Sequence, residues 1–378
     1  METNFTNARI VGRDGVLSGG VSVRDGVIAE VGDGPAAPTG ALDFEGDFLL
    51  PGLIEMHTDN VEKHFSPRPG VIWPSSKAAV IAHDLQIAGA GITTVFDALS
   101  AGDYGEGGDR RRMLADAVWA LGACATQGFL RADHLLHMRC EVSDAGVVEI
   151  FEQFVNHPLL RLVSLMDHTP GQRQWAEVSK YRLFHRSKNW TDPEFQAHLE
   201  SLLESQQRYA RLHREQIIGM TKPRALRLAS HDDTTEEHVA EAVASGITIS
   251  EFPTTLEAAG AARQAGMKVI MGAPNLVRGG SHSGNASAAE LAGQGLLDGL
   301  SSDYVPSSLL HAAFLLHGVV GLPLHKAIAS VTANIADMLD LGDRGVIEPG
   351  RRADLIRVRM DGDLPVVLTV WREGRRVI

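Results

Sequence analysis

Residues 49–60 of this chain read LLPGLIEMHTDN, and the organisation of the remaining sequence follows from this stretch. The pair Pro51-Gly52 leads into a short apolar run that ends in His57 and Asp59. Side chains two residues apart on a strand project from the same face, so one imidazole and one carboxylate can reach a single cation. In a parallel α/β barrel, such a pair at the carboxyl end of a strand lies at the catalytic mouth. Taken alone, a His-x-Asp is more often a chance pair in a solvated loop.

Length and composition favour an ordinary globular enzyme. The 378 residues are 44% hydrophobic and 22% charged, which suits one large α/β domain with an appended module or two medium domains. The formal charge of −12 argues against nucleic-acid and anionic membrane partners, because both need a basic face. Two cysteines form no disulfide framework, and the chain shows neither a signal peptide nor a long apolar run. We expect a cytoplasmic enzyme.

The two ends of the chain share a character that the middle lacks. Residues 1–50 contain short β-prone pieces punctuated by Asp14-Gly15, Asp25-Gly26 and Asp33-Gly34, which indicate hairpin turns. Residues 345–378 are similarly rich in β-branched residues. Because the termini of a domain often lie close together, we predict one composite β-sandwich built from both ends.

Residues 51–344 alternate apolar strand-like runs with helical stretches, which is the pattern of βα units. Eight runs predict a closed (β/α)8 barrel. They are Leu53–Asp59, Ile92–Asp97, His134–Glu141, Leu160–His168, Ala225–His231, Ile247–Glu251, Lys268–Met271 and a weaker run, Leu296–Asp303. The interval of about 170–222 exceeds an ordinary crossover, so we predict an inserted helical excursion whose most regular part is Phe195–His213.

Further polar residues stand at the ends of these runs. Glu141, His168, His231 and Asp303 each follow a strand-like run, although singly each also fits a solvated strand end, a core histidine or a helix cap. With the opening pair they give six imidazole and carboxylate ligands around one mouth. Six such ligands are enough for two divalent ions, with zinc preferred and manganese or iron as alternatives.

Several motifs resemble the amidohydrolase superfamily. They are Pro51–His57, Ser230-His231-Asp232, Ser302-Asp303 and Gly350–Leu355. The resemblance covers essentially the whole chain and implies a metal-dependent hydrolase with a distorted (β/α)8 barrel and a β-sandwich made from both termini. It also implies that Glu141 bridges the metals and that the catalytic residue Asp303 binds metal and accepts the proton of the attacking water.

Two features depart from the superfamily pattern. Asp59 stands where the superfamily has the second histidine of its opening motif, and a harder oxygen ligand could change the preferred metal. Our strand count also places Glu141, His168 and His231 on the third, fourth and fifth strands, whereas the superfamily's two histidines usually follow the fifth and sixth. Either a strand near the insertion is missing from the count or one assignment is wrong.

Longer motifs resemble one subgroup, the diphosphatases of the carbon–phosphorus lyase pathway of phosphonate catabolism. They include 57–70, Arg139-Cys140-Glu141, 166–172, 250–255 and 272–285. This resemblance implies that α-D-ribose 1-methylphosphonate 5-triphosphate is hydrolysed to the 5-phosphate and pyrophosphate. The polyphosphorylated sugar needs basic donors at the mouth. We predict that these are Lys63, His64 and Arg68 after the first strand, with Arg278 and His282 after the seventh.

Two other functions stay open on sequence grounds. An amide or cyclic C–N hydrolase, such as a deacetylase or deaminase, would use the same metal ligands. A catalytically inactive barrel acting as an assembly protein would lose metal ligands, which this chain largely keeps. The sequence also leaves open the assembly of two copies into a homodimer.

Overall fold

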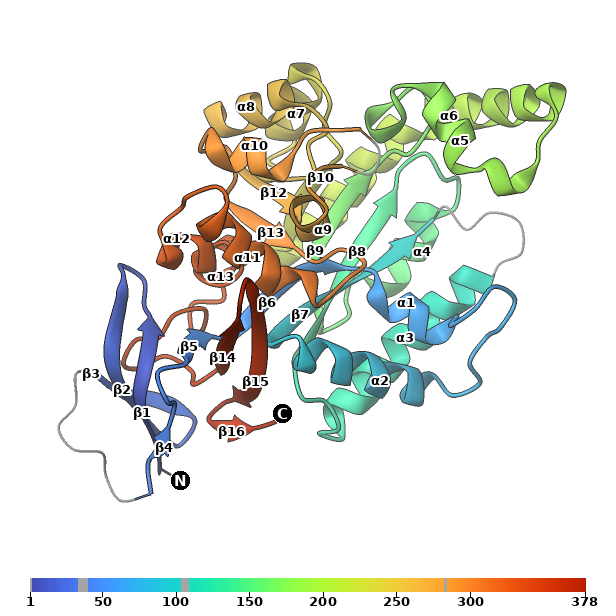
Figure 1. The fold of residues 1–378 in the computed structure, drawn as a ribbon. Coiled ribbons are helices and arrows are strands. Elements are labelled where there is room, and N and C mark those ends of the chain that lie inside the picture. Colours follow the sequence, from blue (N-terminus) through green and yellow to red (C-terminus); the bar gives the residue numbers. More distant parts are fainter. Residues whose placement is uncertain (1, 33–39, 103–108, 282–283) are drawn as a thin grey trace.

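The computed structural model describes residues 2–32, 40–102, 109–281 and 284–378. Within these residues the chain forms one parallel sheet and one mainly antiparallel sheet from the two ends of the chain (Figure 1). The predicted α/β fold, a (β/α)8 barrel with a β-module from both termini, is therefore confirmed. Across the described chain, every helix falls short of the length and apolarity that a membrane span requires.

The parallel sheet follows chain order and contains eight strands within the described residues. They are β6 (Leu53–Thr58), β7 (Ile92–Ala101), β8 (Asp133–Glu141), β9 (Leu160–Met166), β10 (Arg227–His231), β11 (Ile249–Glu251), β12 (Lys268–Gly272) and β13 (Gly299–Ser301). Each predicted apolar run overlaps one of these strands. No additional barrel strand occurs between β9 and β10 in the described part of the chain, so the strand count from sequence was complete.

The seam between β6 and β13 closes mainly through a side chain. Glu55 on β6 is fully buried and accepts hydrogen bonds from Ser301 Oγ at 2.7 Å and from the Ser302 amide at 2.5 Å. A parallel bridge between Thr58 and Asp303 completes the contact at the mouth. The first and last ligand-bearing segments are therefore held together.

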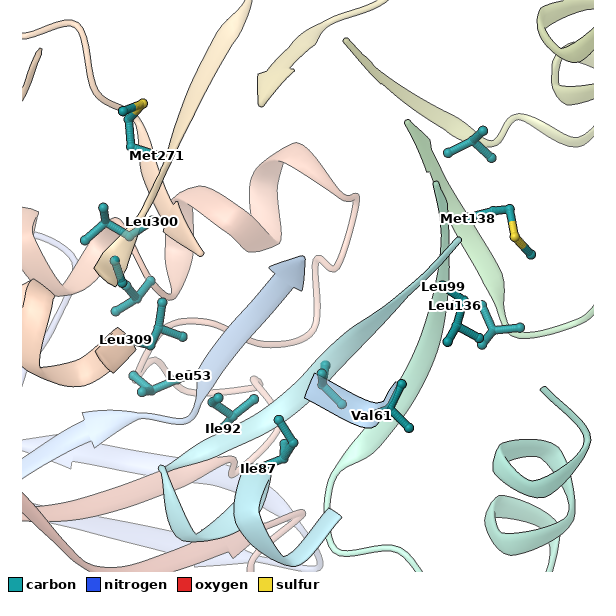
Figure 2. Packing of buried hydrophobic residues seen from close by; sticks show 14 of the residues in the cluster. Leu53, Val61, Ile87, Ile92, Leu99, Leu136, Met138, Met271, Leu300 and Leu309 are labelled. Carbon is teal, nitrogen blue, oxygen red and sulfur yellow. The ribbon is translucent and has the colours of Figure 1, made fainter. Parts of the chain in front are cut away.

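Helices pack around the barrel and against one end of it. They are α1 (Asn60–Phe65), α2 (Ser76–Gly89), α3 (Asp109–Thr126), α4 (Val147–Phe154), α7 (Glu236–Ala244), α8 (Leu256–Gln264), α9 (Ala273–Val277), α10 (Ala288–Gly293), α11 (Ser308–Gly318), α12 (Leu324–Ala329) and α13 (Ala333–Met338). The side chains of Ser75, Thr235 and Thr255 cap α2, α7 and α8. Buried apolar residues such as Ile87, Ile92 and Leu136 fill the space between strands and helices (Figure 2).

The predicted excursion forms a helical arm. It contains η1 (Arg173–Trp175), α5 (Val178–Phe184), η2 (Arg186–Lys188), α6 (Asp192–Thr221) and η3 (Lys222–Arg224). A capping box at Thr191 and Glu194 starts α6, and α5 with α6 projects from the barrel (Figure 1). Ile217 and Ile218 near the end of α6 belong to the main core, so this helix also serves as a barrel helix.

The terminal sheet joins both ends of the chain. Its strands are β1 (Glu2–Val11), β2 (Val16–Arg24), β3 (Val27–Gly32), β4 (Leu42–Asp43), β5 (Phe48–Pro51), β14 (Leu355–Asp361), β15 (Leu364–Arg372) and β16 (Arg375–Arg376). β5 pairs with β1 and β14, so it lies between the two termini. Asp25 and Gly26 both have positive φ in the predicted tight turn, whereas the predicted turn at 33–34 lies outside the described residues. Gly52 then passes against Thr93, where a Cβ would clash, and leads into β6.

Candidate active site

An open cleft lies at the carboxyl ends of the barrel strands. Its lining includes His57, His168, His231 and Asp303, together with Arg139, Asp232, Phe252, Arg278 and Tyr304. Four of the six predicted metal ligands thus share one cleft. The other two, Asp59 and Glu141, lie close to it, because each interacts with one of the four.

Three residues of the mouth adopt left-handed backbone conformations directly after their strands. Asp232, Phe252 and Asp303 have φ of 55°, 55° and 52°. Each amide donates a hydrogen bond to the adjacent segment of the mouth. The acceptors are the carbonyl oxygens of Glu251, Ile270 and His57, at 2.9, 2.8 and 3.2 Å respectively. These hydrogen bonds stabilise a backbone conformation that is otherwise unfavourable. They also fix the position of each Cα atom and the direction of its Cα–Cβ bond.

Glu251 lies beneath the cleft and contacts two predicted ligands. Its Oε1 is 3.3 Å from His57 Nδ1, and its Oε2 is 3.3 Å from His231 Nδ1. Although burial alone would raise it, the pKa of Glu251 is held well below the usual range by the neighbouring histidines. An ionised carboxylate only accepts hydrogen bonds, so both Nδ1 atoms carry the proton. The Nε2 lone pairs of His57 and His231 are then free for a metal.

Glu141 holds His168 rather than lying between two metal-ligand side chains. Its Oε2 is 2.7 Å from His168 Nδ1, and its Oε1 accepts hydrogen bonds from the His168 amide and the Ser143 hydroxyl. The carboxylate that lies between two predicted ligands is Glu251. A metal-bridging role for Glu141 stays a prediction.

Asp232 converges with His168 and His231. Its Oδ2 is 3.5 Å from His231 Nε2 and 3.7 Å from His168 Nε2, and this buried oxygen has no hydrogen-bond partner among the described residues. Donors sharing a zinc ion at about 2.0–2.1 Å in tetrahedral geometry lie roughly 3.3 Å apart. The spacing of these three atoms therefore fits a divalent cation.

Asp59 and Asp303 form an acidic pair at the same mouth. Burial and the charge of Asp59 raise the pKa of Asp303. Asp59 Oδ1 is also buried without a hydrogen-bond partner among the described residues. His57, Arg139 and His231 offset part of this charge, and a divalent cation would offset the rest, so the pair also fits a metal.

The predicted substrate-binding residues occupy different places. Arg278 lines the cleft, and the Lys63 ammonium donates to the carbonyl of Tyr304, which lines it too. His64 instead hydrogen-bonds Gln86 of α2 at 3.0 Å, and Arg68 is exposed beyond α1; neither is among the described residues that line the cleft. His282 lies outside the described residues. Substrate binding by these side chains stays a prediction.

A family model described as the amidohydrolase family matches residues 48–377. The chain belongs to the amidohydrolase family. The resemblance inferred from its motifs is thereby confirmed. This amidohydrolase is 46% identical over 376 residues to the α-D-ribose 1-methylphosphonate 5-triphosphate diphosphatase of Escherichia coli (strain K12), and the match covers 99% of each chain.

Solved structures agree with this amidohydrolase in fold. A Xaa-Pro dipeptidase with bound methionine superposes with a TM-score of 0.67 at 15% identity, covering 100% of this chain and 99% of the other. A 5-methylcytosine deaminase from Klebsiella pneumoniae gives 0.66 at 16% identity, covering 100% and 98%. At these identities the likeness concerns the fold alone.

Sequence reasoning missed three residues of this amidohydrolase's cleft region: Arg139, Asp232 and Glu251. Glu251 ends the sixth predicted strand, where the superfamily usually has a histidine, and this position was the available signal. Asp232 follows His231 directly, but only its left-handed backbone turns the side chain toward the neighbouring histidines. A single arginine on a strand gives no comparable signal.

Proposed function

We propose that this amidohydrolase is a metal-dependent diphosphatase of phosphonate catabolism. It cleaves α-D-ribose 1-methylphosphonate 5-triphosphate to the 5-phosphate and pyrophosphate. The observation that carries the proposal is 46% identity, across 99% of both chains, to the Escherichia coli enzyme of that name. Imidazole and carboxylate donors that face a cleft with basic residues support it.

The side chains divide the chemistry between them. His57, Asp59, His168, His231 and Asp303, with Asp232, would hold divalent metal, for which we propose two zinc ions. The metal supplies a polarised phosphoryl oxygen and a lowered pKa for water. Asp303 accepts the proton of the attacking water, and its raised pKa makes it a stronger base.

The reaction exchanges one bond for another. Water forms a new P–O bond at the linkage between the first and second phosphates, the bridging P–O bond breaks, and pyrophosphate leaves. Arg278 and Lys63 offset the negative charge of the polyphosphate at the rim. We further propose that the enzyme is cytoplasmic and acts as a homodimer on this small molecule, without a nucleic-acid partner.

Phosphorus NMR of the metal-loaded protein tests the function. The substrates are ribose 1-methylphosphonate 5-triphosphate and ATP, and acetate release from an N-acetylated sugar is followed in parallel. We expect pyrophosphate and the 5-phosphate to appear faster from the ribose triphosphate than from ATP. The Asp303→Asn variant should lose this activity, because the amide accepts no proton. Acetate release without a phosphorus product would reassign the enzyme to C–N hydrolysis.

A further inference from the structure

Arg139 places a positive charge in the cleft, where it acts on the charge of Asp303, but it forms no ion pair with any described residue. It lies on β8 two residues before Glu141, so both side chains project from the face that leads to the mouth. The side chain lines the cleft together with His57 and Asp303. Its Nε atom is buried, and it forms no hydrogen bond with any described residue.

Other largely buried arginines of this chain are paired. Arg173 donates to the Asp233 carboxylate and to the carbonyl of His231, and Arg344 donates to Asp133 at 2.8 Å. Arg139, by contrast, has no ion pair within the described residues, although several carboxylates surround the same cleft. Arg139 is half-buried, and a partly desolvated charge without a partner is costly, so a ligand of opposite charge would stabilise it.

We propose that Arg139 is the anion site for the phosphoryl group under attack. This inference rests on the diphosphatase function proposed above. A guanidinium offers donors in a planar fork that matches two phosphoryl oxygens, and its charge does not depend on pH in the physiological range. Because Arg139 lines the cleft beside the proton acceptor Asp303 and acts on its charge, we assign its donors to the phosphoryl group under attack rather than to the distal end of the polyphosphate.

Arg139 would stabilise negative charge on the phosphoryl group and would form no covalent bond with the substrate. As water attacks and the bridging P–O bond breaks, negative charge accumulates on the non-bridging oxygens, and Arg139 offsets it. The proton goes to Asp303 and the electron pair of the broken bond leaves with pyrophosphate. Arg278 at the exposed rim contacts the distal phosphates, so the two arginines should affect different kinetic constants.

Steady-state kinetics of pyrophosphate release test the assignment. The variants are Arg139→Lys, Arg139→Ala and Arg278→Ala, and the matched control is Arg161→Ala, an exposed arginine at the far end of the adjacent strand β9. We expect Arg139→Ala to lower kcat by about 10²-fold or more, with Arg139→Lys intermediate. Arg278→Ala should mainly raise KM, and Arg161→Ala should change neither constant. Added guanidinium at millimolar concentration should restore at least part of kcat in Arg139→Ala alone.

A second readout separates this inference from the function on which it rests. Titration calorimetry with inorganic pyrophosphate should show binding to the metal-loaded wild type and weaker binding to Arg139→Ala. If the wild type hydrolyses no triphosphate but this difference holds, the diphosphatase proposal fails and the anion site stands. An unchanged kcat in both Arg139 variants, or equal loss in both without guanidinium rescue, overturns the site. If Arg139→Ala does not fold, Arg139→Lys carries the kinetic test.

Discussion

Glu251 is one carboxylate that orients two imidazole rings. It is fully buried on β11 and faces the Nδ1 atoms of His57 and His231, both at 3.3 Å. A carboxylate behind a metal-binding histidine fixes the tautomer and the direction of the ring. Because one side chain does this for two rings, its loss should disturb two predicted ligands together.

The substitution Glu251→Gln tests this role. The new amide NH₂ group donates hydrogen bonds and cannot accept one, so one of the two rings loses its acceptor and can adopt the other tautomer. We expect metal affinity to fall by about 10–100-fold while the fold persists. Competition with a chromophoric chelator measures the affinity without turnover. The exposed Glu257→Gln serves as the control, and equal affinities in both variants would contradict the orienting role.

For single residues, the sequence predicts which side chains lie at the mouth better than it predicts their hydrogen-bond partners. His57, His168, His231 and Asp303 were identified because each ends a strand, and the structure brings all four to one cleft. The direction of His64 could not be predicted in the same way, since it depends on how α1 packs against α2. Hydrogen-bond partners distant in sequence are set by tertiary packing alone.

Two helices and two strands meet at a buried ionic cluster. Asp97 on β7 lies 2.8 Å from His134 Nδ1 of β8 and 2.7 Å from His83 Nε2 of α2. His83 Nδ1 in turn lies 3.1 Å from the side-chain nitrogen of Asn60, the first residue of α1. The cluster thus anchors the helix that follows Asp59.

The stability of this cluster depends on pH. Although burial opposes both charges, Asp97 and Asp84 raise the pKa of His134 to about 9, while His134 and His83 lower the pKa of Asp97 to about 2. The histidine contribution is complete below its unfolded pKa of 6.5 and disappears as pH rises through 9. The aspartate contribution is complete above 3.8 and disappears as pH falls through 2.

The variant Asp97→Asn should therefore be destabilised in a defined pH window. We expect the free energy of unfolding to fall by about 3 kcal/mol between pH 4 and 6.5, because the buried imidazolium of His134 loses the nearer of its two carboxylates and keeps only Asp84 at 3.3 Å. The difference from wild type should shrink toward pH 9. Urea unfolding across this range measures it, with the exposed Asp116→Asn as control. A loss that does not vary with pH would show that Asp97 acts through packing alone.

The elements themselves were predictable because their signals are local. Apolar runs marked all eight barrel strands, seven of them ending in a polar residue, and Asp25-Gly26 marked a hairpin turn. The double use of α6, half projecting arm and half barrel helix, was not predictable. Its sequence is helical throughout, and only packing against the barrel distinguishes the two halves.

The barrel and the terminal sheet share one apolar core and a group of ion pairs. Phe48, Leu50 and Ile356 of the terminal sheet belong to the same apolar cluster as the barrel residues. Asp133 at the start of β8 binds several arginines from the C-terminal part of the chain. They are Arg344, Arg352 and Arg372, at 2.8, 2.6 and 3.2 Å.

The substitution Asp133→Asn should weaken this junction. Three guanidinium groups would lose their shared carboxylate, so we expect the free energy of unfolding to fall by about 1–3 kcal/mol. A single thermal transition should persist, because the apolar cluster remains continuous. Calorimetry measures both quantities. The control Asp340→Asn removes the exposed partner of Arg227 and should cost less than about 1 kcal/mol; separate transitions in Asp133→Asn would disprove a shared core.

The left-handed residues at the mouth bear on how the active site can change by mutation. Asp232, Phe252 and Asp303 are held by hydrogen bonds from their own amides, which every replacement except proline keeps. The backbone of the mouth is therefore fixed independently of the side chains that these three positions carry. Substitutions at these positions can change the metal ligands while the backbone that carries them keeps its position. The same barrel can thus come to hydrolyse a different type of bond without a change of fold.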